Sequence, residues 1–101
     1  MLNVSMNDNN GKLAVELEGR LDASTAQNFE KQIEEALDGK KSLTFDFAKL
    51  EYISSAGLRV ILWAQQYMEE KGNGNVVVKN ASDLIKEIFS DTGFTDIIDL
   101  E

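Results

Sequence analysis

Residues 43–78 read LTFDFAKLEYISSAGLRVILWAQQYMEEKGNGNVVV, and the hydrophobic period changes twice within them. Apolar residues alternate with polar ones from Leu43 to Phe47, which is typical of a β-strand with one buried face. From about Ser55 to Lys71 they recur with helical spacing, and Gly72–Gly74 is a typical turn. Val76–Val78 is continuously apolar, as expected for a central strand buried on both faces. This strand–helix–strand unit predicts an α/β layer fold.

Two more alternating runs lie on the N-terminal side of this unit. Residues 2–6 and 13–17 each carry an apolar residue at every second position, and Asn7–Gly11 between them is rich in asparagine and ends in glycine. Two such runs around an Asn/Gly turn predict an antiparallel hairpin. Gly19 then breaks the alternating pattern.

A helix is predicted from Ser24 to Leu37, between the hairpin and the strand that begins near Leu43. At ~100° per residue its apolar side chains gather within roughly a third of the circumference, with charged residues opposite. Asp22 or Ser24 can cap its start, and Gly39 fits its C-terminal exit.

A third helix is outlined by the apolar residues within 84–89. Ser82 can cap it and Gly93 can end it, and residues 97–100 can form a short edge strand. The predicted order is β-β-α-β-α-β-α-β in one domain, residues 1–101. The fold class is therefore α/β, with a mixed sheet of four to five strands and three or more helices.

The composition excludes most catalytic chemistry. The 101 residues include no cysteine and no histidine, which removes thiolate nucleophiles, the Ser-His-Asp triad and the common transition-metal sites. The formal net charge of −8 disfavours contact with nucleic acid or with an anionic membrane. No signal peptide or membrane-spanning apolar stretch is visible. We expect a cytoplasmic protein that is not an enzyme, has no cofactor or metal, and binds neither nucleic acid nor membrane directly.

Two serines, Ser54 and Ser55, mark the start of the second predicted helix. Ser54 can simply cap the helix, with Ser55 in its first turn. The same helix start also favours an anion, including a phosphate esterified to Ser55. The nucleophile elbow of hydrolases is disfavoured, because Ile53 stands where that motif needs glycine and the chain has no histidine base. No lysine lies close in sequence for a Ser-Lys pair, and the junction lacks the sequence of a P-loop.

Asp46 lies at or near the end of the strand that begins at Leu43, where receiver domains carry a phosphoacceptor aspartate. Receivers also need an acidic pair after their first strand to hold Mg²⁺, and the strands that precede Asp46 do not supply it. We therefore interpret Asp46 as an acceptor of backbone N–H bonds in the loop that follows.

Two large apolar residues lie on or beside the polar face of the second predicted helix. At ~100° per residue from Ser55, Leu62 falls inside the polar stripe and Trp63 at its border. A neighbouring loop can shield them, since scattered surface apolar residues are common. Alternatively they form a docking site next to a modifiable serine. The polar stripe itself consists of Ser55, Arg59, Gln66 and Glu70.

Three segments together resemble the STAS domain family: Gly19–Asp22 (GRLD), Asp46 before a loop, and Tyr52–Leu58 (YISSAGL). The resemblance covers essentially the whole chain and is closest to free-standing bacterial anti-sigma factor antagonists. It implies a protein that binds an anti-sigma factor, itself a serine kinase, and so releases a sigma factor. It further implies that this kinase phosphorylates Ser55 and that a metal-dependent serine phosphatase removes the phosphate.

Two departures from the family pattern bear on the site. Ser54 stands where the family often has aspartate, and Ala56 where it often has serine, so Ser54 is the alternative phosphoacceptor. The expected partner-binding residues are Asp22, Asp46, Ser54, Ala56, Gly57, Arg59, Leu62 and Trp63.

Two other functions are weighed against this one. Some STAS domains are non-phosphorylated subunits of membrane transport or lipid-trafficking complexes and dock through the same helix. A small-molecule or nucleotide binder is the weaker alternative, because the sequence has no glycine-rich phosphate loop.

Overall fold

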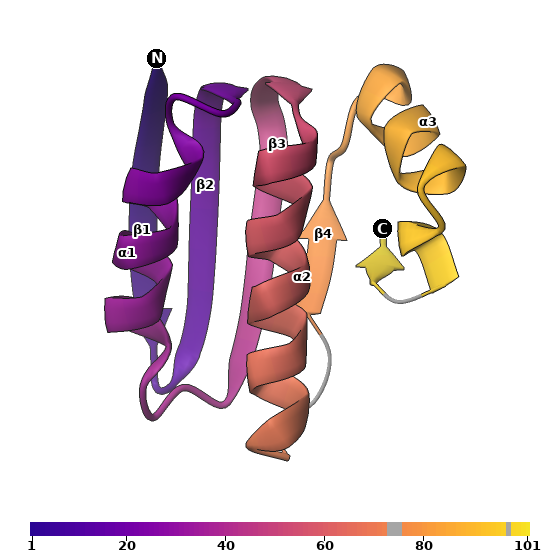
Figure 1. Cartoon of the computed structure of the whole chain (residues 1–101). Coiled ribbons are helices and arrows are strands. Elements are labelled where there is room, and N and C mark those ends of the chain that lie inside the picture. The colour runs from indigo at the N-terminus through magenta and orange to yellow at the C-terminus, as the bar shows by residue number, and fades with distance from the viewer. Residues whose placement is uncertain (73–75, 97) are drawn as a thin grey trace.

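The computed structural model describes residues 1–72, 76–96 and 98–101, and its strands form one sheet in the order β1-β2-β3-β4-β5 (Figure 1). β1 is antiparallel to β2, whereas β2, β3, β4 and β5 are parallel to one another. The predicted fold class, a single α/β layer fold with a mixed sheet, is confirmed. The elements are β1 (Leu2–Asn9), β2 (Lys12–Leu21), α1 (Ala26–Leu37), β3 (Ser42–Ile53), α2 (Ser55–Glu70), β4 (Val76–Lys79), α3 (Asp83–Asp91), a 3-10 turn η1 (Phe94–Asp96) and β5 (Asp99–Leu100).

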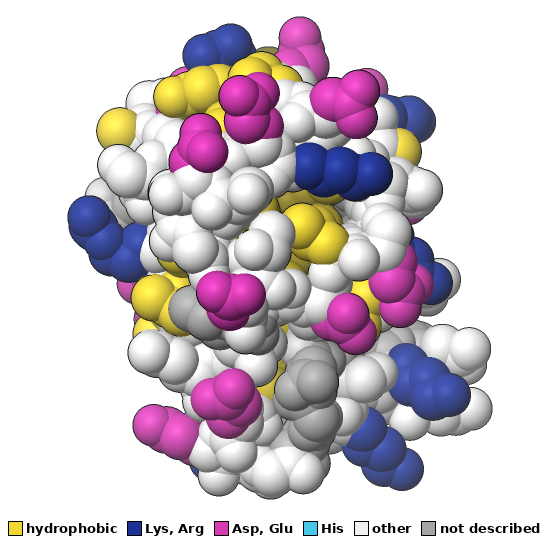
Figure 2. Space-filling model, turned by 90° about the vertical axis from the view of Figure 1, so that its right-hand side faces the viewer, with side chains coloured by type: hydrophobic (Ala, Val, Ile, Leu, Met, Phe, Trp, Pro, Cys, Tyr) yellow, Lys and Arg dark blue, Asp and Glu magenta, His cyan; other side chains and the backbone are white. Residues whose placement is uncertain are grey.

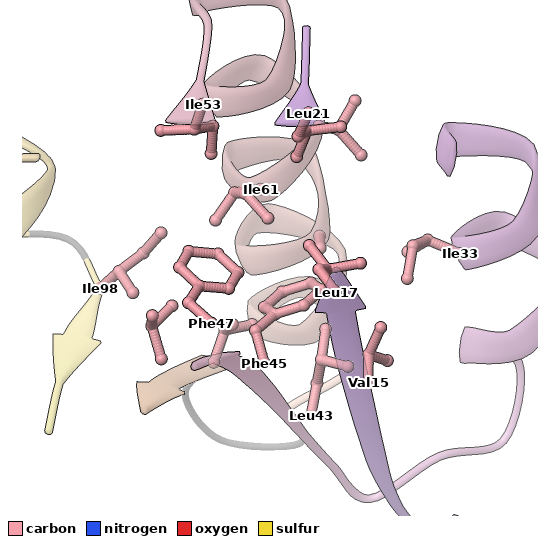
Figure 3. Packing of buried hydrophobic residues seen from close by; sticks show 14 of the residues in the cluster. Val15, Leu17, Leu21, Ile33, Leu43, Phe45, Phe47, Ile53, Ile61 and Ile98 are labelled. Atoms are coloured by element: carbon pink, nitrogen blue, oxygen red, sulfur yellow. The ribbon is translucent and has the colours of Figure 1, made fainter. Parts of the chain in front are cut away.

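The helices cover one face of the sheet, and the core lies between them. In Figure 1, α1 and α2 run in front of the strands. Phe29 of α1 packs on Phe45 of β3 with ring centroids 6.1 Å apart, and Phe89 of α3 packs on Phe47 of the same strand at 6.2 Å. Figure 3 shows how side chains from β2, β3 and α2 converge in this layer. The helices therefore share one apolar surface, which β3 supplies at the centre of the sheet.

The opposite face of the sheet carries no helix among the described residues. Val77 of β4 points to that face and is half-buried, whereas Val76 and Val78 are fully buried on the helix side. The expectation that β4 is buried on both faces is therefore wrong. Its continuous apolar sequence reflects a position between β3 and β5, and an uncovered antiparallel or mixed sheet can expose one face to water.

The predicted hairpin is confirmed, but both of its strands are longer than expected. β1 continues to Asn9, and the turn is confined to Asn10 and Gly11, whose φ angles of 57° and 89° are left-handed. Two left-handed residues match the twist of a tight hairpin. β2 continues through Gly19, which has a φ of 109° and lies at a shift of register against β3. The strand therefore does not end at Gly19 but continues to Leu21.

α1 begins at Ala26, two residues later than predicted, and neither proposed residue caps it. Thr25 occupies the N-cap position without a side-chain cap hydrogen bond. The carboxylate of Asp22 instead accepts a hydrogen bond from the backbone N–H of Ser24 at 3.0 Å, so both residues order the loop before the helix. Gly39, with a φ of 75°, follows the C-cap Asp38 as expected.

β3 is the largest departure from the prediction, because it continues through the expected loop to Ile53. Glu16 pairs with Asp46 and Glu18 with Lys49, so two residues of β3 face one residue of β2 in a bulge. Ala48 and Lys49 are both exposed and break the alternation of buried and exposed residues. This interruption makes the second half of the strand look like a loop in the sequence.

The C-terminal third agrees with the prediction where it is described. Ser82 caps α3 by accepting a hydrogen bond from Ile85 N at 3.3 Å, and Gly93 follows the helix with a φ of 80°. The short edge strand is confirmed as β5, although Ile97 lies outside the described residues. The predicted turn after α2 also lies largely outside them, because only Gly72 of its three residues is described.

Candidate partner-binding site

The predicted serine pair lies at the edge of the sheet where the parallel strands β2 and β3 end. Figure 1 shows these two strand ends at the top of the molecule, together with the start of α2. A backbone hydrogen bond joins them directly, because Ser54 N donates to Leu21 O at 2.9 Å. Loops at the carboxyl ends of parallel strands are the usual place for binding sites in α/β folds.

Ser54 is the N-cap of α2, as predicted. Its hydroxyl accepts a hydrogen bond from Gly57 N at 3.4 Å, and its carbonyl accepts one from Leu58 N at 2.9 Å. Ser54 is half-buried, whereas Ser55 is exposed and its hydroxyl makes no hydrogen bond among the described residues. The capping serine and the freely accessible serine are therefore different residues.

Gly57 lies in the first turn of α2, just after the serine pair, and packs closely against the sheet. It is buried, and a Cβ at this position would lie 2.6 Å from Leu21 Cγ and 2.9 Å from Ile53 Cγ1. Such separations are too short for any side chain to fit without movement. Glycine thus lets the first turn of α2 rest directly on the ends of β2 and β3, and it presents no side chain at the surface. Ala56, its neighbour, is half-buried against the core.

Asp22 lies in the loop after β2, at the same edge as the serines. Its Oδ1 accepts hydrogen bonds from Ser24 Oγ at 2.7 Å and from Ser24 N at 3.0 Å. These bonds, with the Ser24 hydroxyl first and Thr25 as a smaller contributor, hold the pKa of Asp22 below its usual value. The other carboxylate oxygen lies 3.9 Å from Arg20 Nε, and the Arg20 guanidinium stacks 4.7 Å from the centre of the Tyr52 ring. The loop is therefore tied to the last residues of both strands.

Asp46 is not brought together with the serine pair. Ile53, at the end of β3, lies seven residues further along the strand, which is about 23 Å at the rise of a β-strand. Its Oδ1 accepts hydrogen bonds from Ala48 N and from Asn80 Nδ2, both at 3.0 Å. The Asn80 bond first, and the Ala48 bond second, lower its pKa. Asp46 accepts a backbone N–H as predicted, but it stabilises the β3 bulge instead of a loop.

The polar stripe predicted on α2 is present, and Leu62 and Trp63 lie at its two borders. Ser55, Arg59, Gln66 and Glu70 are exposed, whereas Leu62 and Trp63 are both half-buried. Trp63 also packs in part against the core, so it is not purely a surface residue. Leu62 and Trp63 are adjacent in sequence and hence about 100° apart around the helix.

Residues spaced by four form one continuous row along α2 that the sequence reasoning did not recognise as a unit. The Trp63 and Tyr67 rings have centroids 5.4 Å apart, and Lys71 Nζ lies 5.5 Å from the centre of the Tyr67 ring. Residues four apart are neighbours on a helix surface. We call this row the α2 ridge; it consists of Ser55, Arg59, Trp63, Tyr67 and Lys71. The four-residue spacing was available in the sequence as its signal.

Gln65 is a further residue that sequence reasoning missed, and it fixes α2 against the sheet. It is only 1% exposed, and its Oε1 accepts a hydrogen bond from Val76 N at 2.9 Å. Its Nε2 donates to Glu69 Oε1 at 2.9 Å. A polar residue on the core-facing arc of a predicted helix was the available signal, because buried polar groups need partners.

Other site types find no support in the described part of the chain. No group of three or more acidic side chains there could hold a metal ion. No helix among those residues has the length and apolar character needed to cross a membrane. Viewed from the side of β5 and α3, acidic and basic side chains are interspersed and apolar side chains show in separate small patches (Figure 2).

Comparison with known proteins identifies the family. A family model described as "Mlab, STAS domain" matches residues 4–99. The chain belongs to the STAS domain family. The "Putative anti-sigma factor antagonist BtrV" of Bordetella bronchiseptica is 29% identical over 97 residues, which cover 95% of this chain and 83% of that protein. The predicted family resemblance is therefore confirmed.

Solved STAS domains share the fold at low sequence identity. An anti-sigma factor antagonist from Mycobacterium paratuberculosis superimposes with a TM-score of 0.86 at 21% identity, covering 99% of this chain and 85% of its own. The Bacillus cell fate determinant SpoIIAA in its phosphorylated form gives 0.77 at 17% identity, covering 98% and 91%.

Proposed function

We propose that this STAS domain is an anti-sigma factor antagonist whose binding is switched by phosphorylation of Ser55. It binds an anti-sigma factor that is also a serine kinase, and a sigma factor is thereby released. The observation that carries the proposal is that the two serines differ in hydrogen bonding and in exposure. Ser54 uses its hydroxyl to cap α2, whereas the Ser55 hydroxyl is exposed and makes no hydrogen bond with any residue that the structure describes. The anti-sigma factor antagonist named among its relatives supports the same function.

Phosphorylation of Ser55 would alter binding without unfolding the protein. The kinase transfers the γ-phosphoryl group of ATP to Ser55 Oγ and releases ADP, and a phosphatase later hydrolyses the ester. The phosphate adds about −1.5 to −2 charges to a chain that already carries −8. A tenfold loss of affinity requires only about 1.4 kcal/mol, which one unmatched phosphate in an interface readily exceeds. Ser55 is exposed, so the fold has room for the added group.

The chain itself is proposed to act only by binding. It has neither histidine nor cysteine to serve as base or nucleophile. Its proposed partners are the anti-sigma factor kinase and the serine phosphatase, with no nucleic acid, no membrane surface and no cofactor, and it would act in the cytoplasm. The expected contacts lie along the first half of α2, up to Trp63, with Asp22 beside the start of the helix. Asp46 is the exception among the expected contacts, because it lies far down β3 on the other face of the sheet.

The test combines the purified chain with a candidate anti-sigma factor kinase and ATP, and locates the phosphate by mass spectrometry. We expect the phosphate on Ser55, and loss of kinase binding after phosphorylation. Ser55→Ala should bind without being switched off, and Ser55→Asp should bind more weakly than wild type. Ser54→Ala serves as the matched control and should still be labelled.

Three outcomes would contradict the proposal in different ways. Phosphate on Ser54 would exchange the roles of the two serines. Binding that phosphorylation leaves unchanged would remove the switch. Neither labelling nor kinase binding would favour the alternative of a non-phosphorylated subunit in a transport or lipid-trafficking complex.

A further inference from the structure

Ser55 and Arg59 are neighbours along the α2 ridge. They are four residues apart, or about one helical turn, and both side chains are exposed. The Cβ atoms of such a pair lie about 5–6 Å apart on a helix, which is within reach of a long side chain. An arginine at this spacing can fold back over the residue that precedes it by one turn.

The two arginines of the chain differ in how they are engaged. Arg20 stacks on the Tyr52 ring and lies 3.9 Å from an oxygen of Asp22. Arg59 has no hydrogen bond, ion pair or ring contact with any residue that the structure describes. Its neighbours on α2 offer no carboxylate either. The residues three and four positions away are Ser55, Ala56, Leu62 and Trp63.

The start of the helix supplies some of the hydrogen-bond donors for a phosphate on Ser55. Gly57 N donates to the Ser54 hydroxyl and Leu58 N to the Ser54 carbonyl, whereas Ser55 N and Ala56 N make no hydrogen bond among the described residues. A donor from a side chain would add a charged partner to these two N–H groups. Guanidinium groups bind phosphate oxygens through two parallel, charge-assisted hydrogen bonds, which are strong and specific in geometry.

We propose that Arg59 binds the phosphate of phosphorylated Ser55 across one turn of α2. This contact gives phosphorylation a second effect on the docking surface. In the unmodified protein Arg59 lies between Ser55 and Trp63 on the ridge, where its charge is open to a carboxylate of a partner. Once paired with the phosphate it is withdrawn, so one modification adds negative charge and also removes a positive charge from the same surface. The inference deepens the proposed function and rests on Ser55 as the modified residue.

The experiment installs phosphoserine at position 55 during synthesis of the chain, so that no kinase is needed. The pH titration of the phosphate is then followed by ³¹P NMR in wild type, Arg59→Gln and Arg59→Lys. The second pKa of phosphoserine is about 6 when it is unperturbed. A paired arginine stabilises the dianion, so we expect the pKa in wild type to be lower than in Arg59→Gln by about 0.3 unit or more. Arg59→Lys should give an intermediate value.

Arg20→Gln is the matched control, because it removes the other arginine, which is already engaged with Tyr52 and Asp22. The phosphate of that variant should titrate as in wild type. Thermal unfolding gives a second readout: phosphorylation should raise the midpoint in wild type relative to Arg59→Gln. Equal phosphate pKa values in wild type and Arg59→Gln would overturn the inference. The proposed function would fail separately, if a kinase left Ser55 unmodified or if phosphorylation left binding unchanged.

Discussion

Gly57 and Leu21 lie so close that a methyl group on the glycine would reach within 2.6 Å of Leu21 Cγ. Gly57 belongs to the first turn of α2 and Leu21 is the last residue of β2. The contact therefore fixes the distance between the first turn of α2 and the end of β2. Ser54 and Ser55 precede Gly57 directly, so their position depends on the same contact.

Gly57→Ala should destabilise the fold, because the added methyl group overpacks a closed contact. We expect a loss of about 1–3 kcal/mol in the free energy of unfolding, measured by urea denaturation. The cost should be smaller when the background carries Leu21→Ala, which removes the overlapping Cγ. Ala56→Ser, at the neighbouring half-buried position, is the control for a small change in this turn. Equal costs of Gly57→Ala in both backgrounds would show that the Leu21 contact does not set the helix position.

Replacement of Ser54 by alanine should lower the free energy of unfolding more than the same replacement of Ser55. Removal of the capping hydroxyl in Ser54→Ala should cost about 0.5–2 kcal/mol of unfolding free energy. Ser55→Ala should change it by less than about 0.5 kcal/mol, because the exposed hydroxyl makes no hydrogen bond among the described residues. The two variants differ by the same atom at adjacent positions, so each controls for the other. A larger loss for Ser55→Ala would reverse the assignment of the cap.

Trp63→Ala should weaken partner binding at least tenfold, because tryptophans at the centre of interfaces often contribute 2 kcal/mol or more. Its packing against Tyr67 and the core adds a stability cost of about 1–2 kcal/mol, less than a fully buried tryptophan would show. Leu62→Ala tests the other border of the polar stripe. Met6→Ala, which removes an exposed apolar side chain on β1, is the control. A large loss of stability with unchanged affinity in the folded fraction would assign Trp63 to the core alone.

Asp46 should make the stability of the fold depend on pH in the acid range. Its folded-state pKa is lowered chiefly by the Asn80 amide, so the ionised form is favoured in the folded protein. This contribution is present above the unfolded pKa of about 3.9 and is lost as pH falls through the lower folded pKa. The stability difference between wild type and Asp46→Asn should shrink as pH falls below about 4. Asn80→Ala should raise the pKa of the Asp46 carboxyl, observed by ¹³C NMR; an unchanged pKa would remove the Asn80 bond as its main cause.

Local patterns were sufficient to predict the elements, since each depends on a run of neighbouring residues. The alternation in residues 13–17 and the cap at Ser54 both appear in the structure as expected. The β3 bulge could not be predicted in the same way. It arises because two residues of β3 face one residue of β2, and a single strand read alone shows only a lost alternation at Ala48 and Lys49.

In the candidate site, too, features set by neighbouring residues could be predicted, and features set by tertiary packing could not. Ser54 and Ser55 follow each other in sequence, so their roles at a helix start could be predicted from local rules. The packing of Trp63 on Tyr67 and the core depends on what surrounds α2, and helical angles alone place it only at a border. The displacement of Asp46 from the serines follows from the unexpected length of β3.

The face of the sheet that no described helix covers also protects the strands against a shift in register. A shift of β2 by one residue along β3 would expose the side chains of Leu13, Val15 and Leu17 to solvent. It would also bury the carboxylates of Glu16 and Glu18 beneath the helices. A strand with two apolar faces would bury apolar side chains in both registers, so neither register would be favoured. Because one face is exposed to water, only the native register keeps the charged side chains out of the core. In that register Leu21 pairs with Ile53.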